Sequence, residues 1–279
     1  MISRRDVLKA ALAGAVATAD GASSPPTLGL LSPVESTVPP EATALYPAGV
    51  RFLAQSIGLK KMTPAGYDAV LDRIGPTAAA LARQGAQAIT LMGTSLSFYK
   101  GAAFNRELTR RVAEASGRPA VTMSTAVIDG LRSVGGKRVA VATAYDETVN
   151  QRLQTFLHEE GFQVLTIRGL GVEKVEDIYK VTQDGLFKFG VEVFESARNA
   201  DSLLVSCGGL HTLDLLAPLE RRCKVPVVSS MPHALRASAL RPRLSVTRHE
   251  LASDTARLIP APTATSGTPP GRSSAARSG

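Results

Sequence analysis

The sequence predicts an α/β protein built on parallel β-strands. Short runs of apolar and β-branched residues alternate with longer stretches of helical pattern, which is typical of parallel sheets joined by crossover helices. The run at 139–142 is apolar at every position, as expected for a strand buried on both faces of a sheet. The predicted strands lie at 27–31, 88–91, 120–123, 138–143, 163–167, 202–206 and 226–229.

Helices are expected between these strands. Thr63 followed by Pro64 is a typical helix start, so one helix is predicted from there to Gln84. The pair Gly75-Pro76 interrupts that pattern, and a kink or break is expected there. Further helices are predicted at 146–160, 182–197 and 212–223, and one within 233–258.

The first 26 residues are predicted to be an export signal rather than part of the fold. They contain a run that resembles the twin-arginine signal, Ser3-Arg4-Arg5-Asp6-Val7-Leu8-Lys9. An apolar stretch at 10–17 follows, too short to span a bilayer, and then small residues suited to a signal peptidase. We therefore expect a periplasmic protein with no membrane association after cleavage. The alternative is a disordered or short helical N-terminus that happens to contain two arginines.

The positive charge is concentrated near the C-terminus. The formal net charge is +8, and residues 232–279 hold seven arginines against two acids. Charge placed in a tail is weak support for a nucleic-acid partner, and the absence of Trp argues against an aromatic base-stacking surface. Residues 259–279 are rich in Ser, Thr, Pro, Ala and Arg and are predicted to be a disordered tail.

Three predicted strands end in residues that could bind an anion. Leu91 leads into a Met-Gly-Thr-Ser turn, Ser206 into Cys207-Gly208-Gly209, and Thr143 into Ala-Tyr. Ligands of open α/β sheets bind at the carboxyl ends of the strands, where glycines and helix starts present backbone amides. Taken one at a time, these segments are equally compatible with ordinary tight turns.

The same segments resemble the arylmalonate decarboxylase family, part of the aspartate/glutamate racemase superfamily. The resemblance covers about residues 27–230 and rests on the runs at 63–70, 92–99, 122–126, 140–145 and 206–210. It implies two similar parallel-sheet α/β halves with the active site in the cleft between them. The expected division is 27–124 plus 208–258 for the first half and 125–207 for the second.

The cysteine pattern decides which activity of the superfamily is expected. Its racemases use two cysteines, one on each face of the substrate. Cys207 stands at the second cysteine position, whereas the first position is Gly93. One acid on one face suits decarboxylation of an α-aryl or similar malonate followed by one-sided protonation. The alternatives are a racemase or isomerase of the same superfamily, and an exported, non-catalytic binder of small carboxylates.

The resemblance also implies a role for individual residues. Cys207 is the expected proton donor, and apolar surroundings would keep its thiol protonated. Thr94, Ser95, Tyr145 and the amide of Gly208 are the expected donors to the oxyanion. The expected substrate pocket comprises Pro33, Leu59, Met62, Gly93, Val175 and Ile178, for which plain core packing is the alternative.

No metal ion or organic cofactor is expected, because the sequence has no ligand cluster or phosphate loop. The expected partner is a small dicarboxylate substrate. Cys207 and Cys223 are predicted to be free, although an oxidising periplasm would permit a bridge between them. His211 is predicted to lie at the surface or rim of the site. Val34, Met62 and Ile178 depart from the family pattern, so the pocket is expected to differ in shape.

Overall fold

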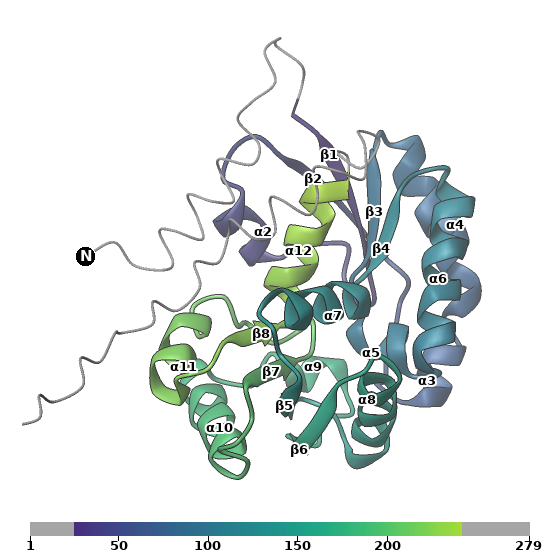
Figure 1. Cartoon of the computed structure of the whole chain (residues 1–279). Coiled ribbons are helices and arrows are strands. Elements are labelled where there is room, and N and C mark those ends of the chain that lie inside the picture. Colours follow the sequence, from purple (N-terminus) through teal and green to yellow (C-terminus); the bar gives the residue numbers. More distant parts are fainter. Residues whose placement is uncertain (1–24, 242–279) are drawn as a thin grey trace, which may run out of the picture.

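Two parallel sheets of four strands each form the centre of the computed structural model, which describes residues 25–241 (Figure 1). The first sheet has the order β2-β1-β3-β4, and the second has the order β6-β5-β7-β8. The first sheet contains β1 (Thr27–Ser32), β2 (Arg51–Ser56), β3 (Ala88–Leu91) and β4 (Ala120–Thr122). The second contains β5 (Arg138–Thr143), β6 (Gln163–Gly169), β7 (Ser202–Ser206) and β8 (Val227–Ser229). The predicted fold class is confirmed.

Helices flank both sheets (Figure 1). In the first half, α4 (Leu71–Arg83) and α6 (Gly101–Ser116) pack on one side, while α12 (Ser230–Leu240) and α2 (Pro40–Leu45) lie on the other. In the second half, α8 (Glu147–Glu159) packs on β6, α10 (Gln183–Glu195) on β5 and α11 (Leu216–Cys223) on β8. The remaining helices are α3 (Pro64–Asp68), α5 (Thr94–Phe98), α7 (Met123–Ser133) and α9 (Val175–Ile178).

All seven predicted strands are present, with ends within two residues of the predicted ones. β3, β4, β7 and β8 are buried along their whole length, which explains why continuous apolar runs identified them. The strand that the sequence did not predict is β2. It lies at the edge of its sheet, is only partly buried, and mixes polar with apolar residues.

The predicted division of the chain is wrong at β8. Residues 208–258 were expected to join the first half, but β8 pairs in parallel with β7 of the second sheet, with Leu203 opposite Val227. A buried strand cannot leave the backbone groups of one side unpaired, and β8 supplies the partners of β7 on the side away from β5. The next element, α12, packs on α7, α2 and β3.

The predicted helix starting at Thr63 is interrupted at a different place. Thr63 caps α3 by accepting a hydrogen bond from the amide of Gly66, as expected. The break falls at 69–70, and α4 continues through Pro76. Buried residues on both sides of Pro76 keep the helical spacing, so packing against the sheet outweighs the single backbone hydrogen bond lost at the proline. The helix predicted at 212–223 begins only at Leu216.

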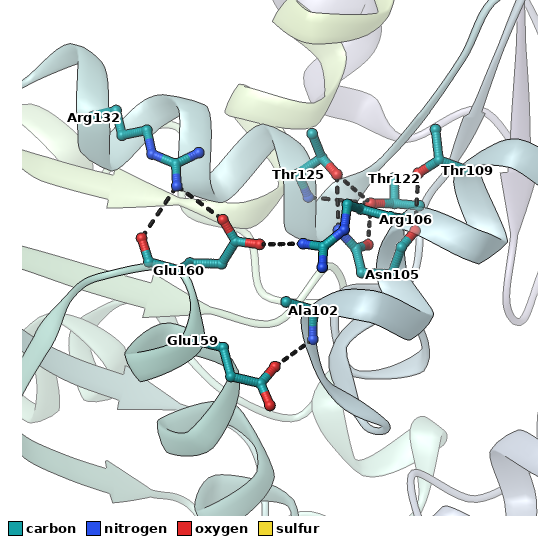
Figure 2. Close-up of polar contacts among 9 residues, drawn as sticks. All are labelled: Ala102, Asn105, Arg106, Thr109, Thr122, Thr125, Arg132, Glu159 and Glu160. Carbon is teal, nitrogen blue, oxygen red and sulfur yellow. Dashed lines mark hydrogen bonds and ion pairs between the residues drawn. The ribbon is translucent and has the colours of Figure 1, made fainter.

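A polar network joins the two halves beside the sheets (Figure 2). In the second half, Glu159 accepts a hydrogen bond from the amide of Ala102, the second residue of α6. The neighbouring Glu160 pairs with Arg132 of α7 at 2.8 Å and with Arg106 of α6 at 3.5 Å. These contacts join α8 to helices of the first half.

The predicted signal segment lies outside the described residues except for its last two positions, and the predicted tail at 259–279 lies outside them entirely. The helix predicted within 233–258 is represented by α12, which begins at Ser230. Within 25–241, the structure contains no helix with the length and apolar character needed to cross a membrane.

Candidate active site

A cavity lies where the carboxyl ends of strands from both sheets meet. Residues following β1, β3, β7 and β8 line it, together with the loop that carries α9. Every predicted site residue except Tyr145 lies on its wall. These are Pro33, Leu59, Met62, Gly93, Thr94, Ser95, Val175, Ile178, Cys207 and Gly208.

Cys207 follows the last residue of β7 and is 4% exposed. Burial raises the pKa of its thiol to about 11, although backbone hydrogen bonds from Gly209 and Leu210 and an interaction with Tyr145 oppose the shift. A thiol with this pKa is protonated at neutral pH. It is therefore suited to donate a proton, and poorly suited to attack as a thiolate.

The turn after β3 presents hydroxyl groups to the cavity. Thr94 and Ser95 are the first two residues of α5, and both are buried. Two further side chains hold the turn rigid. Ser97 Oγ donates to the carbonyl of Gly93 at 2.8 Å, and Ser124 Oγ donates to the carbonyl of Thr94 at 2.9 Å. Because these carbonyls are occupied, the turn can offer a ligand only its hydroxyls and amides, and the Thr94 hydroxyl is itself bonded to Ser230 Oγ at 3.0 Å.

Gly208 allows the two halves to approach closely at this point. A Cβ atom at this position would lie 2.9 Å from Met123 Sδ and 3.1 Å from the carbonyl oxygen of Met92. Only glycine therefore fits between the two strand-end segments without displacing one of them. The close approach brings the amide of Gly208 and the turn at Thr94 and Ser95 to the same cavity.

Tyr145 does not line the cavity as predicted. Its side chain is fully buried, and its hydroxyl lies 3.4 Å from Ser206 Oγ. It interacts electrostatically with Cys207 and Thr94, both of which do line the cavity. Burial raises the pKa of this phenol well above its usual value, so the hydroxyl keeps its proton as a hydrogen-bond donor. Edge-to-face packing on Phe98 holds the ring behind the site.

The apolar part of the wall comes from both halves. Leu59 and Met62 belong to the first half, and Val175 and Ile178 to α9 of the second. The two segments are joined by an antiparallel bridge between Lys61 and Lys174, and the amide of Met62 donates to the carbonyl of Glu173 at 2.9 Å. All four apolar side chains are buried, so they offer a carboxylate little solvation.

Two ionisable residues at the site, Glu41 and Tyr67, were not among the predicted site residues. Glu41 of α2 was not predicted, and it lines the cavity with 6% of its surface exposed. Its Oε1 lies 3.1 Å from Nδ1 of His211, whose side chain is half exposed, so the predicted rim position of His211 is confirmed. Tyr67 is buried close to Ser95 and Cys207. It lies in the run at 63–70, one of the runs that resemble the family, and that resemblance is the sequence feature that could have identified it.

The cavity wall carries acids and no basic side chain other than His211. Glu35 and Glu41 line it, and no Lys or Arg is found among the described residues of the wall. Within 25–241, no three His, Cys, Asp or Glu side chains are grouped so that they could hold a metal ion. Cys207 and Cys223 are both free, as predicted.

The chain matches known proteins over most of its length. A family model described as arylmalonate decarboxylase matches residues 28–246. The arylmalonate decarboxylase of Bordetella bronchiseptica is 49% identical over 210 residues, which are 75% of this chain and 87% of that protein. The maleate isomerase of Nocardia farcinica (strain IFM 10152) is 28% identical over 111 residues, 38% of this chain and 41% of that protein.

Solved structures show the same relationship. A mutant arylmalonate decarboxylase in the liganded form matches with a TM-score of 0.75 and 45% identity, covering 78% of this chain and 92% of that chain. The unliganded enzyme matches with a TM-score of 0.71 and 45% identity over the same shares. A mutant Nocardia farcinica maleate cis-trans isomerase with a covalently bound succinylcysteine intermediate has a TM-score of 0.70 at 21% identity, again over 78% and 92%, and this likeness concerns the fold.

Proposed function

The chain belongs to the arylmalonate decarboxylase family and is a carboxy-lyase, and from this premise we propose that it converts an α-aryl or similar malonate to CO2 and a chiral monocarboxylic acid, with Cys207 as the proton donor. The observation that carries the proposal is the placing of one buried, protonated thiol, a set of neutral hydrogen-bond donors and an apolar wall around a single cavity. No cofactor is required for the steps below.

The donors hold the carboxylate that stays on the product. Thr94 and Ser95 offer hydroxyl groups, and Ser95 and Gly208 offer backbone amides, on the same cavity. Tyr145 supports this set from behind through Thr94. The other carboxylate of the malonate then falls on the apolar wall of Leu59, Met62, Val175 and Ile178, where the charged group is poorly solvated and neutral CO2 is not penalised.

Cleavage of the bond between the α-carbon and the departing carboxylate leaves its electron pair on the α-carbon. The pair delocalises into the retained carboxylate, which becomes an enediolate with additional negative charge on both oxygens. Donors fixed in position before the reaction stabilise that charge, each by about 3–4 kcal/mol where the geometry is good. The rigid turn at Gly93–Thr94, with its carbonyls occupied by Ser97 and Ser124, supports this role.

Protonation completes the reaction. The S–H proton of Cys207 passes to the α-carbon, the enediolate returns to a carboxylate, and the thiolate left behind takes a proton from solvent. Cys207 is the one thiol on the described cavity wall, and Gly93 has no side chain. A single donor favours one product enantiomer. The absence of a second thiol on the described wall argues against the two alternative hypotheses, a two-base racemase and an isomerase.

The direct test is the decarboxylation of α-methyl-α-phenylmalonate, which gives a stereocentre that does not exchange readily. We expect CO2 release together with a marked excess of one enantiomer of 2-phenylpropionate, measured by chiral chromatography. CO2 release with a racemic product would contradict protonation by one fixed thiol. Absence of CO2 from this substrate and from phenylmalonate would contradict the proposed substrate class and favour a carboxylate-binding protein.

We also propose that the protein is exported. The support is the order of a twin-arginine-like run, an apolar stretch and a cleavage-like site within residues 1–26. Two free cysteines are compatible with an oxidising compartment only if they stay apart, and both are buried at separate places, Cys207 at the cavity and Cys223 at the end of α11.

A further inference from the structure

The cavity contains one polar feature that the proposed reaction does not use, the pair formed by Glu41 and His211. Glu41 projects from the first turn of α2, whereas His211 lies in the loop that follows Cys207 and Gly208. Both line the cavity, and they come from segments 170 residues apart in the sequence. Their meeting at 3.1 Å is therefore a property of the folded cavity wall.

Glu41 is more than nine-tenths buried and is only half satisfied. Its Oε1 takes the hydrogen bond from His211, while Oε2 is buried and has no hydrogen-bond partner among the described residues. A buried acceptor without a partner costs about 1–3 kcal/mol, so such an atom calls for an explanation. The last torsion of a glutamate side chain is soft, which lets a donor inside the cavity meet this oxygen after a small rotation.

The charge of the wall indicates which donors suit it. Glu35 also lines the cavity, where its carboxyl accepts a hydrogen bond from Thr37, and no Lys or Arg is present on the described wall. The groups that hold the malonate are neutral hydroxyls and amides, so the acids do not serve that part of the substrate. A cationic donor on the remainder of the substrate would be complementary to the acids.

We propose that Glu41, oriented by His211, is the specificity-determining residue for the α-substituent, and that the preferred substrates are malonates whose substituent carries an ammonium or similar cationic hydrogen-bond donor. This inference rests on the proposed decarboxylase function, whose malonate site it extends. His211 acts as a positioning residue, because its Nδ1–H holds one carboxylate oxygen and leaves the other for the ligand.

The test compares two substrates with the same number of non-hydrogen atoms, para-aminomethylphenylmalonate and para-ethylphenylmalonate. We expect kcat/KM of the unchanged protein to favour the ammonium substrate by about tenfold, as for one buried charged hydrogen bond. In Glu41→Gln, which keeps the size of the side chain and removes its charge, that preference should vanish. The matched control is Glu192→Gln on the exposed side of α10, which should retain the preference.

Glu41→Met serves as the second variant should Glu41→Gln fail to fold, because it fills the same space without a buried polar atom and should also lose the preference. Equal kcat/KM values for the two substrates in the unchanged protein, or a preference that persists in either Glu41 variant, would overturn the inference.

Failure of the inference can be separated from failure of the decarboxylase proposal. If neither malonate releases CO2 and unsubstituted phenylmalonate releases none either, the proposed function is wrong. Calorimetry with para-aminomethylphenylacetate and para-ethylphenylacetate then measures recognition alone. Tighter binding of the ammonium compound that depends on Glu41 would support the inference in that case too. Equal affinities would contradict it.

Discussion

Thr94 Oγ1 donates a hydrogen bond of 3.0 Å to Ser230 Oγ, and this bond joins the two sheets at the site. Thr94 begins α5 shortly after β3 of the first sheet, and Ser230 begins α12 directly after β8 of the second. Both residues are buried, so water does not compete for the bond. The bond fixes one orientation of the Thr94 side chain on the cavity wall. The Thr94 hydroxyl has a single proton, so it donates to an oxyanion when Ser230 Oγ takes over as the donor within this pair.

Replacement of this hydroxyl tests the role of Thr94. Thr94→Val keeps the branched shape and removes the donor, so we expect kcat for phenylmalonate to fall about 10²-fold. The control is Thr155→Val on the exposed face of α8, which removes a hydroxyl bonded only to the carbonyl of Gln151. A rate close to that of the unchanged protein, in a Thr94→Val variant that folds normally, would contradict the assignment.

A second thiol at position 93 should change the reaction. In Gly93→Cys the cavity would contain two thiols, so we expect a pure 2-arylpropionate to be racemised over time while CO2 release declines. The new Cβ would lie 3.0 Å from Leu96 Cβ and from Pro33 Cγ, so a loss of about 1 kcal/mol in the free energy of unfolding is also expected. Chiral chromatography and thermal unfolding measure the two effects.

Gly93→Ala separates the thiol from the crowding. It introduces the same Cβ without sulfur, so it should show a similar loss of stability and no racemisation. An unchanged enantiomer ratio in Gly93→Cys after long incubation would mean that a thiol at position 93 does not reach the α-carbon.

The raised pKa of Cys207 predicts an unusual pH profile. The protonated thiol is the reactive form, and burial raises its pKa to about 11. The rate should therefore stay level through the region near pH 8.5 where an ordinary cysteine loses its proton, and decline only as the pH approaches 11. Single-turnover rates measured alongside circular dichroism would distinguish this from unfolding. A decline centred near pH 8.5 would show that the thiol is solvated.

The export proposal makes a separate prediction. Replacing both Arg4 and Arg5 with Lys keeps the charge and removes the twin-arginine pair, so the protein should remain in the cytoplasm. Cell fractionation followed by immunoblotting measures this. A protein found in the periplasm despite the change would contradict a twin-arginine route.

The sequence predicted those parts of the fold that depend on local pattern. Buried strands such as β7 read as continuous apolar runs, and the start of α3 was visible from a capping threonine followed by proline. β2 has no such pattern because an edge strand with partly exposed residues does not need one. Likewise, β8 was assigned to the wrong half, because pairing between strands is decided by the fold rather than by local sequence.

The same distinction applies to the site. Residues directly after strands, such as Thr94 and Cys207, could be placed at one edge because parallel strands share a direction. Tyr145 also follows a strand, but its large ring packs behind the wall. Glu41 could not be found in this way, because it reaches the cavity from a short helix outside the sheet.

The central claim is that Cys207 supplies the proton. Its most direct test is CO2 release from phenylmalonate by the unchanged protein, by Cys207→Ala, and by Cys223→Ala as a control that removes the other buried thiol away from the cavity. We predict rapid release by the unchanged protein and by Cys223→Ala, and a loss of about 10²-fold or more in Cys207→Ala. Release at the unchanged rate by a folded Cys207→Ala variant would contradict the mechanism.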